Sequence, residues 1–223
     1  MIRDGATIAG AAEQRALIDL AAAAGLVLSD AQVKQLLDFL DLLEQWGSVY
    51  NLTSVRDRAA MRSQHLADCL AVVTPLARRA PGPRLLDVGS GGGLPGVVLA
   101  VARPDWRVTC VDAVAKKAAF VRQVAGRLGL SNLQVLHARV EAVRAGSFDV
   151  ITARAFATLA DLVRVSATLL APGGIWMAMK GRHPADEIAA LPASVEVFHV
   201  EPLTVPHLDA ERCLVWMRRR ETK

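Results

Sequence analysis

The stretch that decides the fold is LLDVGSGGGLPG, residues 85–96. It begins as an apolar run interrupted by one carboxylate, Asp87, and then places glycine at five of its last eight positions. A short apolar run is typical of a strand buried on both faces of a parallel sheet, and glycine lets a backbone turn tightly and approach a ligand closely. The stretch therefore predicts a strand, a turn into a helix and a binding site at that turn.

Downstream of this stretch, short apolar segments alternate with amphipathic ones. The alternation predicts a doubly wound α/β fold with a mostly parallel sheet and crossover helices. The expected strands are residues 84–88, 107–112, 133–136, 148–153 and 175–180. The expected helices are residues 95–103, 115–128, 139–144 and 157–170, followed by a turn at 171–174. The expected closing antiparallel pair is residues 195–200 and 212–218.

The part of the chain before the sheet has a helical pattern. Ser29 and Gln32 form a capping box, apolar residues follow at helical spacing, and Gly47 is placed to end that helix. Another helix is expected at residues 63–80, before a Pro-Gly-Pro turn. We therefore expect two domains, a helical extension at residues 1–80 and a sheet domain at 81–223.

Composition indicates a globular protein with an uneven charge. The 223 residues are 52% hydrophobic and carry a net charge of +4. Residues 1–70 hold 6 basic and 9 acidic side chains, whereas residues 71–223 hold 20 and 13. A basic second part is compatible with a nucleic-acid partner, and equally with an Arg-rich enzyme that has an ordinary substrate.

Other features exclude several classes of protein. The apolar run at residues 20–28 is too short to span a bilayer and lacks the flanks of a signal peptide, so we expect a cytoplasmic protein without a membrane segment. Cys69, Cys110 and Cys213 lie far apart without CxxC spacing, which indicates neither a disulfide framework nor a metal site. Nothing in the sequence demands more than a monomer.

The glycine-rich turn matches two cofactor patterns. GxGxxG at residues 91–96 has the spacing of the dinucleotide fingerprint, which holds a pyrophosphate. DxGxGxG at residues 87–93 resembles the S-adenosylmethionine loop of Rossmann-like methyltransferases. A carboxylate beside the loop suits a cofactor with a sulfonium and an ammonium better than it suits a pyrophosphate. Asp112, which ends the next strand, can accept the ribose hydroxyls of either cofactor and does not separate them.

Four further motifs help to decide between these two cofactor patterns. They are YNLT at residues 50–53, HLADCL at 65–70, TARAFA at 152–157 and MKGR at 179–182. With the glycine-rich stretch, they resemble the bacterial small-subunit rRNA guanine-N7 methyltransferase family, also called glucose-inhibited division protein B, over nearly the whole chain. The resemblance implies a class I Rossmann-like methyltransferase fold, S-adenosylmethionine as cofactor, and 16S rRNA or a small-subunit assembly particle as partner.

The resemblance and the loop pattern together imply the site residues. Those expected to bind the cofactor, with adenine near the Val140-Glu141 pair, are Asp87, Gly89, Gly91, Leu94, Asp112, Val140, Glu141 and Arg154. Those expected to face the RNA are Asn51, His65, Phe156, Lys180 and Arg182. Structural alternatives stay open for three of them: His65 as a buried structural histidine, Phe156 as a core residue and Glu141 as a solvated acid.

The implied reaction explains why no catalytic residue is assigned. Guanine N7 carries a lone pair and no proton, so attack on the sulfonium methyl needs no general base. Two other functions stay open from the sequence alone. One is an NAD-type oxidoreductase that uses the GxGxxG overlap, and the other is a binding module that holds S-adenosylmethionine without turnover.

Overall fold

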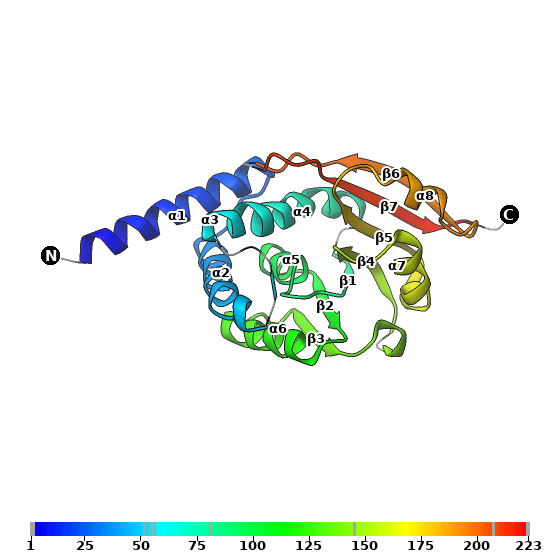
Figure 1. The fold of residues 1–223 in the computed structure, drawn as a ribbon, viewed down its shortest axis with the longest axis horizontal. Coiled ribbons are helices and arrows are strands. Elements are labelled where there is room, and N and C mark those ends of the chain that lie inside the picture. Colours follow the sequence, from blue (N-terminus) through cyan, green and yellow to red (C-terminus); the bar gives the residue numbers. More distant parts are fainter. Residues whose placement is uncertain are drawn as a thin grey trace.

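One seven-stranded sheet forms the centre of the protein in a computed structural model that describes residues 3–50, 52–53, 55, 57–80, 82–144, 146–206 and 208–221 (Figure 1). The strand order is β3-β2-β1-β4-β5-β7-β6, and β7 is antiparallel to both of its neighbours while β1 to β5 run parallel. The strands are β1 (Arg84–Val88), β2 (Arg107–Asp112), β3 (Leu133–His137), β4 (Phe148–Arg154), β5 (Leu170–Lys180), β6 (Val195–Pro202) and β7 (Cys213–Arg219). The predicted fold class, the strands and the closing antiparallel pair are confirmed.

Helices cover both faces of this sheet. On one face lie α4, α5 and α6, with α1 and α2 packed behind them, and on the other lie α7, α8 and the turn η2. The helices before the sheet are α1 (Arg3–Ala23), α2 (Asp30–Tyr50), α3 (Arg58–Met61), the π-helix η1 (Arg62–Ala67) and α4 (Asp68–Arg79). The helices and helical turns that connect the strands are α5 (Gly96–Ala102), α6 (Ala115–Leu128), η2 (Val140–Ala142), α7 (Leu159–Ser166), η3 (Ala167–Leu169) and α8 (Ala185–Ala189). None of the described helices is long and apolar enough to cross a membrane.

The start of α2 follows the prediction and its end does not. The Gln32 amide donates to Ser29 Oγ (3.3 Å) and the Ser29 amide donates to Gln32 Oε1 (2.9 Å), which is the expected capping box. The prediction that Gly47 ends this helix is wrong, since α2 runs on to Tyr50. Continuation stacks the Tyr50 ring on Trp46 one turn earlier, with centroids 5.5 Å apart, and this contact outweighs the weak helix propensity of one glycine.

The helix expected at residues 63–80 begins earlier than predicted. Asp57 caps it by accepting from the Ala60 amide at 2.7 Å, and α3, η1 and α4 then follow one another without a break. The middle turn is a π-helix, a feature that is found mostly at functional sites. It carries His65 and leads directly into Asp68.

Two local predictions in the sheet domain are also wrong. The helix expected at residues 139–144 is only the short 3₁₀ turn η2, because the connection from His137 to Phe148 is too short for a helix and the two loops that it would need. The turn expected at residues 171–174 lies inside β5, where Gly173 has a φ of +73° and the pairing with β4 shifts register. The chain absorbs these residues as a bulge.

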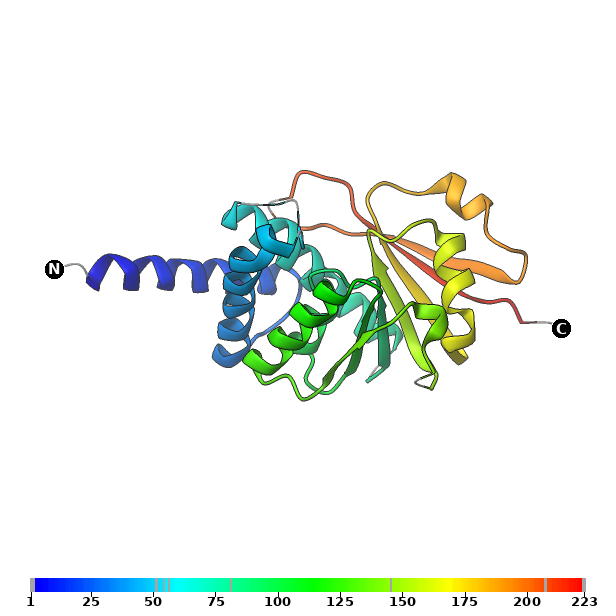
Figure 2. The same cartoon turned by 60° about the horizontal axis from the view of Figure 1, so that its bottom comes forward.

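The helical extension and the sheet share one hydrophobic core. Leu17 of α1, Phe39 of α2 and Val98 of α5 belong to a single buried cluster, while the first turns of α1 project away from the body (Figure 2). A Cβ added at Gly92 would lie 3.2 Å from Leu43 and 3.5 Å from Leu52, so the extension abuts the glycine-rich loop. The division of the chain at residue 80 stays a prediction.

Close packing accounts for one glycine of the loop, and a matched pair of variants tests this. A methyl group on Gly96, the first residue of α5, would overlap the Cys110 sulfur and approach Asp87 Oδ2, so Gly96→Ala should lower the free energy of unfolding by about 1 to 3 kcal/mol. Gly126 is also helical but faces open space, so Gly126→Ala should be neutral or stabilising by up to about 1 kcal/mol. Urea denaturation measures both, and equal effects would contradict the packing argument.

Candidate active site

The carboxyl ends of the central strands enclose a cavity of about 270 Å³. It lies where β1 has β2 on one side and β4 on the other, which is the switch point at which open parallel sheets bind ligands. Most of its walls are apolar, and an acid stands at the end of β2. The lining residues are Val88, Gly89, Val111, Asp112, Ala113, Ala138, Arg139, Val140, Glu141, Phe156 and Val165.

The glycine-rich loop forms one wall of this cavity. Gly89 has a φ of +67°, which side chains rarely tolerate, and a Cβ built there would lie 3.0 Å from Cδ2 of the Phe156 ring. The missing side chain therefore leaves room for the ring against the backbone. Glycine at position 89 is required by both the conformation and the contact.

Asp112 ties the loop to the end of β2. Its Oδ2 accepts from the Gly91 amide at 2.9 Å, and its Oδ1 accepts from the Val114 amide at 2.8 Å. Each carboxylate oxygen has two lone pairs, so both oxygens retain the capacity to accept a further hydrogen bond. Asp112 thus positions the loop and also lines the cavity.

Buried polar atoms without partners surround the base of the loop. Asp87 is completely buried, and its Oδ2 accepts from the Gly96 amide at 2.9 Å. Its Oδ1, together with Ser90 Oγ and Thr152 Oγ1, has no hydrogen-bond partner among the described residues. Burial raises the pKa of Asp87 to about 7. Buried polar groups are normally paired, so this region fits a polar ligand or ordered water better than an apolar filling.

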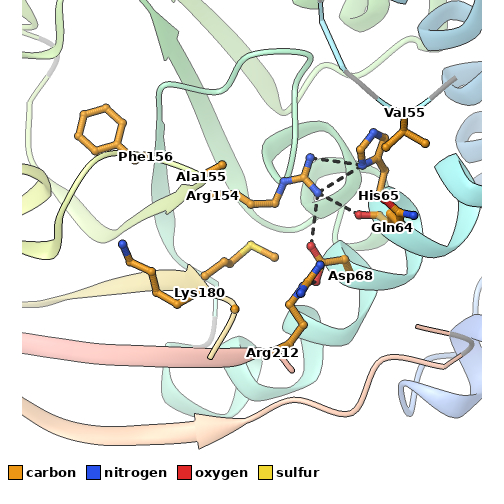
Figure 3. Close-up of a pocket in the computed structure, with 11 residues that line it drawn as sticks. Val55, Gln64, His65, Asp68, Arg154, Ala155, Phe156, Lys180 and Arg212 are labelled. Atoms are coloured by element: carbon orange, nitrogen blue, oxygen red, sulfur yellow. Dashed lines mark hydrogen bonds and ion pairs between the residues drawn. The ribbon is translucent and has the colours of Figure 1, made fainter. Parts of the chain in front are cut away.

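A second pocket, of about 400 Å³ (Figure 3), shares Phe156 with the first. Arg154, at the end of β4, reaches across it and donates to the Gln64 carbonyl (3.2 Å) and to Asp68 Oδ2 (3.3 Å). Arg212 comes from the opposite side and donates through Nε to Asp68 Oδ1 at 3.1 Å. One buried carboxylate from the helical extension therefore holds two arginines from the sheet domain.

His65 forms the far wall of this second pocket in its neutral form. Its Nδ1 lies 3.5 Å from two nitrogens of Arg154, both of which can only donate, so Nδ1 accepts and the proton stands on Nε2. Nε2 then donates to Thr53 Oγ1 at 2.6 Å, which joins the YNLT motif to the HLADCL motif. Burial and the positive charge of Arg154 lower the pKa of His65 to about 4.

Phe156 lines both pockets, and Lys180 fixes the loop that carries it. Ala155, just before the ring, has a left-handed φ of +53°. In Figure 3 the Phe156 ring and the Arg154 guanidinium lie on opposite sides of Ala155. The Lys180 ammonium donates to the Ala157 carbonyl (3.1 Å) and pairs with Glu187 (2.8 Å). This lysine is therefore engaged in holding the loop.

The structure gathers most of the predicted residues in these two pockets. Those in the first are Gly89, Asp112, Val140 and Glu141, with Gly91 bound to Asp112. Asp87 and Leu94 are buried, and Arg154, predicted with the cofactor set, lines the second pocket. Those predicted for the RNA side that line the second pocket are His65, Phe156 and Lys180, and Arg182 lines a neighbouring surface cavity. Asn51 lies outside the described residues.

Three residues that shape the second pocket through polar contacts, Gln64, Asp68 and Arg212, were not predicted as site residues. Asp68 lies within the HLADCL motif, so the sequence pattern could have identified it as a site residue. Gln64 contributes only a backbone carbonyl to Arg154. Arg212 precedes the last strand and stands in no motif. Its partner Asp68 is 144 positions away in the chain, a contact that local sequence patterns do not reveal.

Metal-ligating groups and the state of the cysteines also bear on the prediction from the sequence. No group of three or more His, Cys, Asp or Glu side chains that could hold a metal ion occurs among the described residues. Burial raises the pKa values of Cys69, Cys110 and Cys213, so their thiols are protonated at neutral pH.

The neutral state of His65 gives a direct measurement. In an NMR titration the imidazole signal that disappears in His65→Gln should not shift between pH 8 and about 5, and a midpoint near 6.5 would contradict the arrangement. Because the unfolded chain protonates this side chain at higher pH than the folded chain does, stability should fall as the pH drops from 6.5 towards 4. The loss due to His65 should be about 2 to 3 kcal/mol and absent from the variant.

Comparison with known proteins identifies the family. A family model described as rRNA small subunit methyltransferase G matches residues 32–215. The ribosomal RNA small subunit methyltransferase G of Acidovorax sp. (strain JS42) is 60% identical over 215 residues, covering 92% of this chain and 95% of that protein. The protein of the same name from Leptothrix cholodnii is 62% identical over 202 residues, covering 90% and 93%.

A solved structure agrees with the fold. TrmN from Thermus thermophilus superposes with a TM-score of 0.54 at 21% identity, over 71% of this chain and 53% of that one, which supports the Rossmann-like architecture alone. The family match extends through both pockets and confirms the resemblance that the motifs indicate. This chain belongs to the rRNA small subunit methyltransferase G family.

Proposed function

We propose that this protein transfers the methyl group of S-adenosylmethionine to N7 of a guanine in 16S rRNA. Family membership supports the class of enzyme and of substrate. The observation that carries the proposal is that two pockets meet at Phe156, one suited to a nucleoside cofactor and the other to an anionic nucleotide. A cofactor and a base in these pockets would lie on either side of one aromatic ring.

The residues of the first pocket fit the cofactor. Asp112 has free lone pairs for two ribose hydroxyls, and the Val140-Glu141 pair offers an apolar wall and an acceptor to adenine. The unpaired Asp87 Oδ1 and Thr152 Oγ1 lie at the ends of β1 and β4, where a polar amino-acid end would find partners. When bound, S-adenosylmethionine supplies an electrophilic methyl group on a sulfonium.

The chain's own residues have to orient the base rather than deprotonate it. N7 has no proton, so the absence of an assigned general base fits the reaction. Phe156 is half-buried, and the loop that carries it is held by Lys180, which suits it for stacking on an unstacked guanine. Alignment and exclusion of water are then the main contributions to the rate.

The second pocket supplies the contacts to the RNA backbone. Arg154 and Arg212 line it, and Arg182 extends the basic surface beyond it. The planar guanidinium of arginine can donate two hydrogen bonds to one phosphate. Such contacts fix the position of the RNA without reading its base sequence. We also propose that the protein acts as a monomer in the cytoplasm on 16S rRNA or a small-subunit assembly particle.

The oxidoreductase alternative loses its main support. The third glycine of the GxGxxG overlap, Gly96, packs on Asp87 and Cys110, which accounts for it without a pyrophosphate. An NAD-type function is therefore not favoured, in agreement with the family. A binding module that holds the cofactor without turnover is the outcome that the activity assay has to exclude.

The activity itself is tested by methyl transfer. Protein incubated with S-adenosylmethionine carrying a labelled methyl group and with unmodified 16S rRNA or small subunits should place the label on N7 of a guanine, located by cleavage at the modified base. Transfer should weaken as salt rises, since phosphate contacts release counterions. Cofactor binding without transfer to either substrate would favour the binding module, and label on another atom would refute the proposed reaction.

A matched pair of variants tests the cofactor site. Asp112→Asn leaves a single acceptor oxygen for the loop amides and the ribose, so the dissociation constant of S-adenosylmethionine should rise by about 10- to 100-fold in calorimetry. Asp105, which lies before the opposite end of the same strand and pairs with Arg103, provides the control. Asp105→Asn should leave binding unchanged, and an unchanged constant in Asp112→Asn would remove the assignment.

A further inference from the structure

The arginine pair of the second pocket is organised by one buried acid. The Asp68 side chain is only 5% exposed, whereas those of Arg154 and Arg212 are 20% and 26% exposed. Oδ2 accepts from Arg154 at 3.3 Å and Oδ1 accepts from Arg212 at 3.1 Å. The acid is therefore the buried end of the arrangement, and the two guanidiniums are its accessible end.

The two arginines come from strands that are not neighbours. Arg154 ends β4 and Arg212 precedes β7, while β5 lies between these strands in the sheet. Asp68 begins α4, in the helical extension that precedes the sheet. Convergence of both side chains on one spot thus depends on a carboxylate that the sheet itself does not supply.

The charges in the pocket do not cancel. Among the described residues that line it, Asp68 is the one acid, and it faces two arginines. Glu187 neutralises Lys180 from outside the pocket, and His65 is neutral. One positive charge remains in a partly enclosed space, where an anion is attracted more strongly than at an open surface.

Stability alone gives a poor reason for such an arrangement. A buried ion pair recovers little more than its desolvation cost, and apolar residues of the same volume often stabilise a protein as well or better. What the carboxylate does provide is geometry, because each oxygen fixes one arginine and leaves other nitrogens of that guanidinium to face the pocket.

We propose that Asp68 is a positioning residue that holds Arg154 and Arg212 together as a joint binding site for a phosphate of the RNA next to the target guanine. The inference rests on the proposed function for the identity of the ligand. Asp68 itself does not touch the RNA, and it acts through the two arginines. It does not line the cofactor cavity.

The direction in which Asp68→Asn changes RNA binding distinguishes a positioning role from a purely electrostatic one. Asp68→Asn removes a negative charge beside the phosphates, so without positioning the RNA would bind more tightly. The asparagine has one acceptor oxygen in place of two, and its amide group would face the other arginine donor to donor. We therefore expect the KM for 16S rRNA to rise about tenfold, a larger change than in the dissociation constant for S-adenosylmethionine.

Glu201 provides the matched control. It also pairs with two arginines, Arg78 and Arg79, at 3.3 and 3.1 Å, and it is not among the residues of the second pocket. Glu201→Gln should leave the KM for RNA unchanged. A comparable rise in both variants would assign the effect to general destabilisation and overturn the proposal.

A double-mutant cycle covers the case in which Asp68→Asn folds poorly. Arg212→Met, at the more exposed position, should by itself raise the KM for RNA about tenfold. In that background Asp68→Asn should add clearly less than tenfold, because one of the two arginines through which it acts is gone. Independent effects, or a lower KM in Asp68→Asn, would refute the positioning role, and unchanged KM in Arg212→Met would refute the phosphate site.

The proposed function can fail separately. If the wild type transfers no methyl group to rRNA, that proposal is lost, and the same variants are then compared by fluorescence anisotropy on a labelled 16S rRNA fragment. Weaker binding of Asp68→Asn than of Glu201→Gln in that assay would still support the arginine pair as a phosphate site, and equal binding would overturn it.

Discussion

The arrangement of the site depends on two carboxylates that hold the glycine-rich loop against the sheet. Asp87 accepts from the Gly96 amide and Asp112 accepts from the Gly91 amide, each at 2.9 Å. The loop is thus fixed near both ends to the two strands that support it. This close approach requires glycine, and it places the backbone of Gly89 against Phe156, so the wall shared by the two pockets follows from it.

The helical extension completes the site that the sheet begins. Its π-helical turn brings His65 and the Gln64 carbonyl to Arg154, and Asp68 follows in the next turn. Leu43 and Leu52 approach the loop at Gly92 from the outside. A Rossmann-like sheet with its glycine-rich loop accounts for the first cavity, whereas the second pocket also needs His65 and Asp68 from these helices.

The sequence predicted the features that local chemistry determines. Strands β1 and β2 were expected within their observed bounds because buried parallel strands are short apolar runs, and the capping box of α2 involves residues three apart. The failures have non-local causes. Tyr50 stacking extends α2 past Gly47, and the short connection before β4 leaves room only for η2.

The two pockets differ in the same way, because local sequence determines the first and contacts between remote segments determine the second. The residues that line the first cavity near the loop were predicted because glycine spacing and strand-end acids can be seen in short stretches of consecutive residues. Arg154 was predicted with them, and its guanidinium pairs with Asp68 in the second pocket, so its contact with the cofactor stays a prediction. Arg212 was missed because its place is set by a carboxylate from a distant helix, and charge pairs between remote segments leave no periodic signal in one sequence.

Charge balance links the arginine pair to the proposed chemistry. A guanine that is methylated at N7 acquires a positive charge, which two unpaired guanidiniums beside it would oppose. With Asp68 in place the surplus is a single charge, and a bound phosphate would cancel it. His65 adds nothing to the surplus, because Arg154 and burial keep it neutral. The guanine would then be methylated in a pocket whose net positive charge is cancelled by a phosphate of the RNA itself. The same phosphate contact would bind the RNA and reduce the repulsion of the positive charge that forms on the base.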